Sequence, residues 1–413
     1  MKNERTKVKF FKKPAIKSIS SSLLAILLGI IVGFIIMIIS NPGSSLAGLG
    51  KMFMGSFSHP QGGLQGIGQL LYRATPLIFT GLAVGFSFKT GLFNIGASGQ
   101  YMVGIFAALI VAITGDSLGV MRWPLALLAG ALAGAIWGSI PGIFKAFLNV
   151  NEVITSIMFN HIAVHFINGM LRNVLSSKLV NPSTNRSLPI PQGARTPYAG
   201  LDKIFPNTGL DFGIILAVIS CIVIYIILTK TVFGKELIAV GSNRYAAKYA
   251  GVNEKKSIIL AMTISGMLAG IGGALFILAP SVRGLGNNYS VENVILPAGF
   301  DGITIALLAN SNPLGIFVSA IFIQYIKLGG QYMQSLGFKP EIVEVIVGII
   351  LYFSAFSLIV GKYLAKIFKR KKENDDETIN SEQLLKASDD LEPKDHLSDS
   401  VTSELGGDQL WIM

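Results

Sequence analysis

The chain has 413 residues, of which 51% are hydrophobic and 14% are charged, and its formal net charge is +11. A soluble domain carries roughly 25% charged residues, so this composition excludes one and indicates an all-α, polytopic membrane protein. The ~10-residue alternating segments typical of a membrane β-barrel are absent from the sequence. Basic residues cluster near the N-terminus, at 230–256 and at 362–372, as expected for cytoplasmic segments, and this distribution argues against nucleic-acid binding.

About ten apolar runs approach the ~20 residues that a membrane-spanning helix needs. The first, Ser22–Ile39, follows a basic N-terminal segment, 1–21, and is too long for the apolar part of a cleaved signal peptide. The other predicted spans are Leu64–Phe88, Ile95–Thr114, Trp123–Leu148, Val153–Leu171, Leu210–Leu228, Ile258–Ala279, Val291–Ala309, Leu314–Leu328 and Ile342–Val360. Six spans precede the basic segment 230–256 and four follow it, which predicts that this segment and both termini are cytoplasmic.

The resulting domain organisation is a transmembrane domain over 22–365 between two polar ends. Arg172–Gly209 is predicted to be an external loop, and its several prolines favour turns. Residues 366–413 form a basic flank followed by an acidic, serine-containing tail whose composition predicts cytoplasmic disorder. Cys221 lies in an apolar run and is the chain's one cysteine, so an internal disulfide is excluded.

A polar segment between two apolar runs, Lys89–Gln100, is a candidate part of a substrate path. Three glycines together with Asn94, Ser98 and Gln100 interrupt the apolar sequence here. Irregular backbone at membrane depth is tolerated only where protein buries it or where it lines a watery cavity, and broken helices of this kind are typical of transport sites. A polar turn at the membrane surface is the alternative.

A second interruption, Leu296–Gly315, places a carboxylate within apolar sequence. Asp301 would cost roughly 2.5–3.5 kcal/mol at the centre of a lipid-facing helix, so it is expected to face a cavity, a partner group or water at the end of a span. Glu152 lies near a predicted span end, where solvent reaches it. Both carboxylates leave open an ion-coupled secondary transporter, in which they would carry the coupling ion.

Other motifs argue against a metal site and against chemistry by this chain. His161 and His165 share one helix face, but no third ligand accompanies them, which favours core or interfacial histidines. A phosphate-binding loop is excluded because Lys255 stands where its second glycine is required. No catalytic set supports a membrane-embedded enzyme. A ladder of small residues predicts close helix packing and consists of Gly130, Gly134 and Gly138.

The polar segment Thr231–Gly251 carries a helical pattern of its own between two predicted spans. Within Glu236–Ala247, apolar residues alternate with polar ones at a spacing that predicts a short, weakly amphipathic helix. Such a helix is suited to dock into a groove on another protein. An ordinary cytoplasmic loop is the alternative.

Taken together, these segments resemble the membrane subunit of bacterial ABC importers, in the branch of simple-sugar, nucleoside and branched-chain amino-acid permeases. Gly91–Gln100 is similar to the signature Gly-Leu-Phe-Asn-Ile-Gly-Ala-Glu-Gly-Gln of the nucleoside and simple-sugar permeases, with Ser98 in place of the glutamate. Asn151–Asn160 resembles their Asn-Glu-Val-Ile segment, and Gly299–Gly315 is similar to their late Gly-Phe-x-x-Ile-Ala-Val-Ala-Leu-Leu-Gly segment. Gly234–Gly251 looks like the coupling helix that such permeases insert into their ATPase.

The resemblance covers roughly Leu64–Val360 and implies an importer in the bacterial cell membrane. Its expected partners are an ABC ATPase, a second permease of a different chain, an extracellular substrate-binding lipoprotein and membrane lipid. ATP is used by the ATPase, and this chain is expected to bind no cofactor. A nucleoside ranks first as substrate and a simple sugar second.

The resemblance also implies roles for individual residues. Those expected in the substrate path are Phe93, Asn94, Ser98, Gln100, Phe300 and Asp301. Those expected at the ATPase contact are Gly234, Asn243, Arg244, Ala246, Ala247 and Gly251. Aromatic rings beside amides would suit a nucleobase or a sugar ring through stacking and hydrogen bonding.

Overall fold

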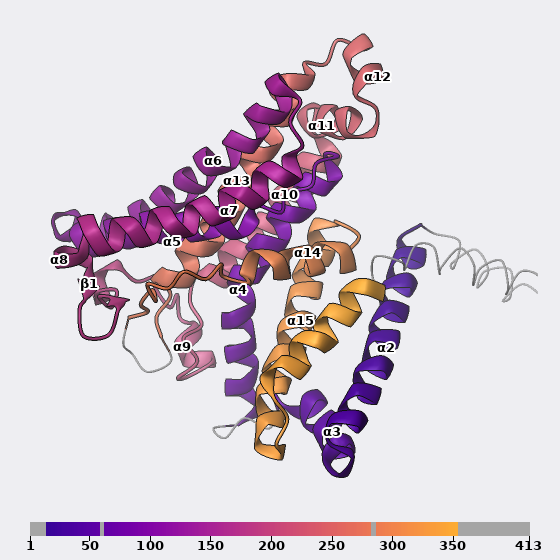
Figure 1. The fold of residues 1–413 in the computed structure, drawn as a ribbon, viewed down its shortest axis with the longest axis vertical. Coiled ribbons are helices and arrows are strands. Elements are labelled where there is room, and N and C mark those ends of the chain that lie inside the picture. Colours follow the sequence, from indigo (N-terminus) through magenta and orange to yellow (C-terminus); the bar gives the residue numbers. More distant parts are fainter. Residues whose placement is uncertain (1–13, 58–61, 282–285, 354–413) are drawn as a thin grey trace, which may run out of the picture. The chain divides into compact units, whose positions relative to one another are not determined.

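The computed structural model describes residues 14–57, 62–281 and 286–353, and these residues are mostly helical (Figure 1). Seven of the described helices are long and apolar enough to cross a membrane, which confirms the polytopic all-α class. They are α4 (Gly63–Lys89), α5 (Ala97–Thr114), α6 (Arg122–Leu148), α7 (Glu152–Gly169), α10 (Gly213–Lys230), α13 (Glu254–Leu278) and α15 (Pro313–Met333).

The first predicted span corresponds to α2 (Pro14–Ser40), which begins within the predicted N-terminal segment 1–21. A short helix, α3 (Ser45–Met54), follows it. Residues 340–353 are helical at the start of the last predicted span, Ile342–Val360, and the rest of that span lies outside the described residues. So does the predicted tail, 366–413.

The predicted span Val291–Ala309 is wrong in extent. Residues 291–297 are irregular, and only α14 (Ala298–Leu308) is helical. Eleven residues reach about 16 Å as a helix, half of the ~30 Å hydrocarbon core. The physical reason is Pro297, which disfavours helical backbone at the residue before it and is tolerated where a helix begins.

The predicted single helix over Glu236–Ala247 is also wrong, because two helices occupy the segment. They are α11 (Val232–Ser242) and α12 (Arg244–Tyr249). Asn243 separates them with an extended backbone (φ −154°, ψ 101°), and its side-chain oxygen accepts a hydrogen bond from the backbone N–H of Ala246. An asparagine cap satisfies a free N–H at a helix start, so it begins a new helix here.

Glycines set the distance between α6, α13 and α5, as the ladder predicted. A Cβ atom added at Gly134 would lie 2.4 Å from the carbonyl oxygen of Gly266, and one added at Gly270 would lie 2.3 Å from that of Gly130. Gly104 of α5 meets the backbone of Gly270 in the same way. The three helices therefore touch backbone to backbone, which only glycine permits.

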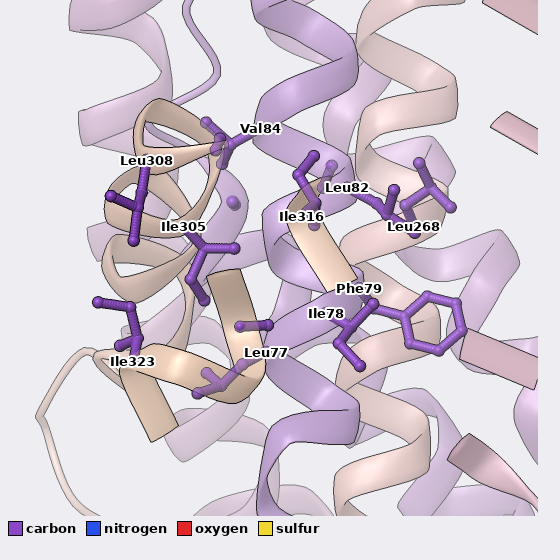
Figure 2. Packing of buried hydrophobic residues seen from close by; sticks show 14 of the residues in the cluster. Leu77, Ile78, Phe79, Leu82, Val84, Leu268, Ile305, Leu308, Ile316 and Ile323 are labelled. Atoms are coloured by element: carbon purple, nitrogen blue, oxygen red, sulfur yellow. The ribbon is translucent and has the colours of Figure 1, made fainter. Parts of the chain in front are cut away.

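Helix α4 packs on α13 and, through aliphatic side chains, on α14 and α15 (Figure 2). Fully buried residues here include Ile78 and Leu82 of α4, Ile305 of α14, and Ile316 and Ile323 of α15. α4 is thus shared between the glycine-packed helices and the short helix α14, and it forms one wall of the site described next.

The predicted external loop, Arg172–Gly209, contains small elements and rests on the segment after α13. Its elements are α8 (Ser176–Leu179), β1 (Val180–Asn181), β2 (Arg186–Ser187) and α9 (Leu201–Ile204), with β1 and β2 antiparallel. The backbone N–H of Ser187 donates to the carbonyl oxygen of Tyr289 at 2.8 Å. We call this end of the helices the loop end, and the end that carries α11 and α12 the α12 end.

Candidate functional site

A cavity of about 410 Å³ lies where α4, α13, α14 and α15 meet, toward the loop end. α4 supplies Tyr72, Arg73 and Pro76 to its wall, α14 supplies Asp301, and α15 supplies Gln324 and Lys327. The remaining wall includes Tyr101, Asp211, Leu275, Phe276, Ala279, Leu296, Pro297 and Ala298. The wall therefore combines aromatic faces with a few charged and amide groups, as ligand pockets do.

Asp301 and Lys327 form an ion pair in this cavity. The Lys327 ammonium lies 2.6 Å from both carboxylate oxygens of Asp301, and the two side chains are 22% and 16% exposed. Asp301 sits in the first turn of α14, where the helix dipole favours a negative charge. The pair explains how a carboxylate is stable at membrane depth, one of the surroundings that the sequence left open for Asp301.

Lys327 was missed as a candidate site residue. It lies inside the predicted span Leu314–Leu328, and a lysine within a span is itself a signal of a functional site. The pairing with Asp301 joins positions 26 residues apart, so only the packing of α14 on α15 reveals it. Glu152, the other carboxylate considered, pairs with Lys145 at 2.9 Å where α6 turns into α7.

Asp211 closes the cavity at the loop end and is buried, with 2% of its surface exposed. It lies before α10, which begins at Gly213 rather than at the predicted Leu210. The hydroxyl of Thr196 donates to its carboxylate. Burial raises the pKa of Asp211 to about 6, although hydrogen bonds from Thr196 and from the backbone of Gly213 lower it.

Asp211→Asn is expected to change how stability depends on pH. The pKa of Asp211 is higher in the folded than in the unfolded protein. Its favourable contribution to the free energy of unfolding is therefore fully present below about pH 4 and is lost as the pH rises through about 6. The variant should flatten this part of the curve of apparent unfolding temperature against pH, measured on the purified protein in detergent. Asp202→Asn, at an exposed carboxylate of the same loop, is the control, and equal slopes in both variants would contradict the prediction.

The predicted path residues Asn94 and Gln100 belong to a buried cluster, not to the cavity wall. The Asn94 amide nitrogen donates to the side-chain oxygens of Gln100 and Ser265, both at 2.7 Å, and Gln100 donates back at 3.1 Å. Asn160 of α7 accepts from the backbone N–H of Gly99 at 2.8 Å. We call Asn94, Gln100, Asn160 and Ser265 the amide cluster; it joins the turn before α5 to α7 and α13.

The other predicted path residues lie around this cluster. Ser98 is fully buried, and among the described residues its hydroxyl has no hydrogen-bond partner. Gly299 of α14 packs directly on it, because an added Cβ there would lie 2.2 Å from the Ser98 backbone nitrogen. Phe93 stacks on Phe88 with ring centroids 4.9 Å apart, and Phe300 is 41% exposed. Of the six predicted residues, only Asp301 lines the cavity.

The predicted ATPase-contact residues fall into two groups at the α12 end. Gly234 and Ala247 are buried against this chain, whereas Asn243, Ala246 and Gly251 are exposed. Arg244 is held by an ion pair with Glu254 at the start of α13, at 2.6 Å.

The largest exposed groups on α12 are Tyr245 and Tyr249, which are 77% and 93% exposed and were not predicted. Their spacing of four residues places them on one helix face, a signal that the sequence already contained.

The amino-acid sequence matches one known family of membrane transport proteins over most of its length. The family described as branched-chain amino acid transport system, permease component, matches residues 66–355. The chain belongs to this family. It is therefore a membrane permease subunit of an ABC transporter, as the resemblance implied, and the ion-coupled alternative has no support.

Individual relatives agree with this assignment over most of their length. The chain is 37% identical to the guanosine ABC transporter permease protein NupP of Bacillus subtilis over 84% of this chain and 96% of the relative. It is 34% identical to the nucleoside permease NupB of Lactococcus lactis (83% and 92%) and 31% identical to the glucose permease TsgB13 of Haloferax volcanii (75% and 81%). No solved structure matches significantly.

Proposed function

We propose that this chain is one of two different permease subunits of an importer that takes up nucleosides. The observation that carries the proposal is its similarity to the guanosine permease NupP and the nucleoside permease NupB, of which it covers 96% and 92%. The glucose permease is less similar, at 31% identity. A simple sugar is therefore the competing substrate.

Two permeases with the same stated substrate in one organism support a partner of a different chain. NupQ of Bacillus subtilis and NupC of Lactococcus lactis, named as guanosine and nucleoside permeases, are each 28% identical to this chain. NupP and NupB come from the same two organisms and are more similar to this chain. We infer that the second permease is of the NupQ or NupC kind.

The cavity suits a nucleoside in size and in chemistry. Its volume of about 410 Å³ is within the ~300–1,000 Å³ of small-molecule sites. The rings of Tyr72 and Phe276, which both keep accessible surface, offer stacking faces for a nucleobase. Asp301 offers hydrogen bonds to the base edge or the ribose. Lys327 shares the Asp301 carboxylate and so holds it in position until a substrate arrives.

The amide cluster is proposed to position helices, because its buried side chains have no free surface for a substrate in this conformation. Ser98 contributes through its contact with Gly299, which fixes the start of α14 and hence Asp301. Phe93 and Phe300 keep accessible ring surface and remain proposed contacts along the path.

The α12 end is proposed to be cytoplasmic and the loop end extracellular. The basic residues of 230–256 gather at the α12 end, which matches the positive-inside rule. The N- and C-termini are then cytoplasmic, and the cavity opens from the outer half of the membrane. The loop 172–209 would receive the substrate-binding lipoprotein, and the exposed aliphatic side chains of α10 would face lipid.

The ATPase is proposed to bind α12 and the start of α11, and to use ATP that this chain does not bind. Gly91, in the turn before α5, meets α11 so closely that an added Cβ would lie 2.3 Å from the Cα atom of Gly241. Three residues later, Asn94 enters the amide cluster. A shift of α11 caused by the ATPase would therefore reach α5 and, through Ser98, α14.

Tyr249→Ala is expected to weaken ATPase binding while the permease stays folded. Tyrosine is enriched among the hot spots of protein interfaces, and truncating a hot spot costs about 2 kcal/mol or more, roughly a thirtyfold loss of affinity. The measurement is the amount of ATPase that co-purifies with the tagged chain in mild detergent. Tyr198→Ala, at a 38% exposed tyrosine of the loop 172–209 and therefore far from α12, is the matched control. Equal ATPase recovery from Tyr249→Ala and from the unchanged chain would count against α12 as the contact.

The proposed function is tested by purifying the complex and measuring uptake. Co-purification should yield an ATPase and a second permease, and proteoliposomes that contain the complex and its binding protein should take up guanosine only with ATP. Excess unlabelled nucleoside should compete, whereas glucose should not. Competition by glucose alone would overturn the substrate, and uptake without an ATPase would overturn the mechanism.

A further inference from the structure

Helix α7 carries two imidazole side chains on a face that no described residue of this chain covers. His161 and His165 are exposed, and the exposed residues around them are Ile154, Ile157, Met158, Ile162 and Phe166. At ~1.5 Å per residue, the histidines lie about 14 Å and 20 Å from the first residue of α7. α7 has 18 residues and is about 27 Å long, so His161 lies near its middle and His165 about one turn before its end.

The irregular segment before α14 runs at the same depth. One end of it is fixed near the far end of α7, where the Asn168 amide donates to the carbonyl oxygen of Glu292 at 2.7 Å and to the Asn293 side chain at 2.9 Å. Glu292, Asn293 and Val294 are exposed. Along the axis of α7, residues 292 and 293 therefore lie about one turn beyond His165.

The other end of the segment reaches the level of Asn160. Gly299, just after the segment, packs on Ser98 of α5. Gly99, which follows Ser98, donates its backbone N–H to the side chain of Asn160 on α7. The segment 292–297 thus descends beside the part of α7 that carries both histidines. Its non-helical backbone lies at membrane depth, where such backbone is found only when buried in protein or facing a water-filled cavity. Leu296 and Pro297 line the cavity described above, whereas the part around Asn293 is exposed and needs another cover.

The exposed faces of α6 and α10 differ from this surface. On α10 the exposed residues before Thr229 are Ile215, Val218, Ile219, Ile222, Val223 and Ile226. On α6 they are Leu128, Leu132, Ile136, Ile143, Phe147 and Leu148. These faces are suited to lipid. Imidazoles and irregular backbone are not, because lipid offers them no hydrogen-bond partner.

We propose that the α7 face, which we define as His161, His165 and segment 292–297, is the surface on which the second permease packs. The inference rests on the proposed function, which supplies two similar permease chains. Similar subunits related by a two-fold axis bring equivalent faces together. The imidazole N–H groups of one subunit then donate hydrogen bonds to acceptors of the other. In this chain, the equivalent acceptors are the Glu292 carboxylate and the Asn293 side-chain amide.

Site-specific photo-crosslinking in the whole complex tests this surface. The photoreactive residue p-benzoylphenylalanine replaces His161 or His165 in separate variants, and it replaces Ile222 of α10, which is 45% exposed, as the matched control. The complexes are irradiated in native membranes, and adducts are identified by mass spectrometry. We expect adducts with the second permease at positions 161 and 165 and only lipid adducts at 222.

Lipid adducts alone at 161 and 165, while the second permease co-purifies, would overturn the assignment of this surface. Second-permease adducts at 222 instead would move the interface to α10. Adducts between two copies of this chain would overturn the choice of a different permease as partner. Failure of any second permease to co-purify would instead defeat the proposed function, so the two failures are distinguishable.

Discussion

Lys327→Met is expected to abolish substrate uptake and to destabilise the protein. The substitution leaves the Asp301 carboxylate without its cation in a cavity where both side chains are less than a quarter exposed. Breaking a fully buried pair costs about 3–5 kcal/mol, and this partly buried pair should cost somewhat less. The measurements are ATP-dependent uptake in proteoliposomes and the apparent unfolding temperature in detergent.

The double variant Asp301→Asn with Lys327→Met separates the two effects. Removing the unpaired charge should restore most of the unfolding temperature, because no ion is left buried alone. Uptake should stay low, since the proposed substrate contact is lost as well. Lys145→Met is the matched control, because it breaks the Lys145–Glu152 pair outside the cavity. Normal uptake by Lys327→Met would show that the cavity is not on the path.

Gly270→Ala is expected to lower stability although alanine favours helices. The new Cβ atom would lie 2.3 Å from the carbonyl oxygen of Gly130, and backbone cannot move aside as a flexible side chain can. Overpacking of this kind costs about 1–3 kcal/mol, which exceeds the gain of up to about 1 kcal/mol from helix propensity. The fraction that stays monodisperse after heating, followed by size-exclusion chromatography, should fall.

Gly169→Ala provides the matched control for this substitution. Gly169 is also helical, but an added Cβ would meet no atom within 4 Å. The same change should therefore be neutral or slightly stabilising. Equal losses at both glycines would mean that the contact between α6 and α13 is not what requires glycine.

Much of the fold could be predicted because apolar runs of span length have few alternatives in a membrane. Seven predicted spans correspond to α4, α5, α6, α7, α10, α13 and α15. The glycine ladder correctly predicted close packing, since only small residues let helices approach in lipid. Local chemistry explains the two errors of extent: Pro297 delayed the start of α14, and Asn243 capped a new helix in the predicted coupling segment.

The site was harder to predict from the sequence than the fold, because its side chains come from distant parts of the chain. Asp301 was correctly expected to need a cavity or a partner, but Lys327 was not named as that partner. The resemblance predicts that Asn94 and Gln100 belong to the path, and polar groups at membrane depth are typical of transport sites. In the structure they bond to each other and to Ser265, which no spacing rule relates to them.

The class, the approximate spans and the family can be read from the amino-acid sequence, since these depend on hydropathy and on motifs that are local in the chain. Which polar groups are satisfied internally and which remain accessible depends on how the helices pack. Asn94 is buried in the amide cluster, Asp301 faces a cavity, and His165 is exposed on α7. The physical reason is that a polar side chain at membrane depth needs a partner, and the packing of non-adjacent helices determines which one it finds.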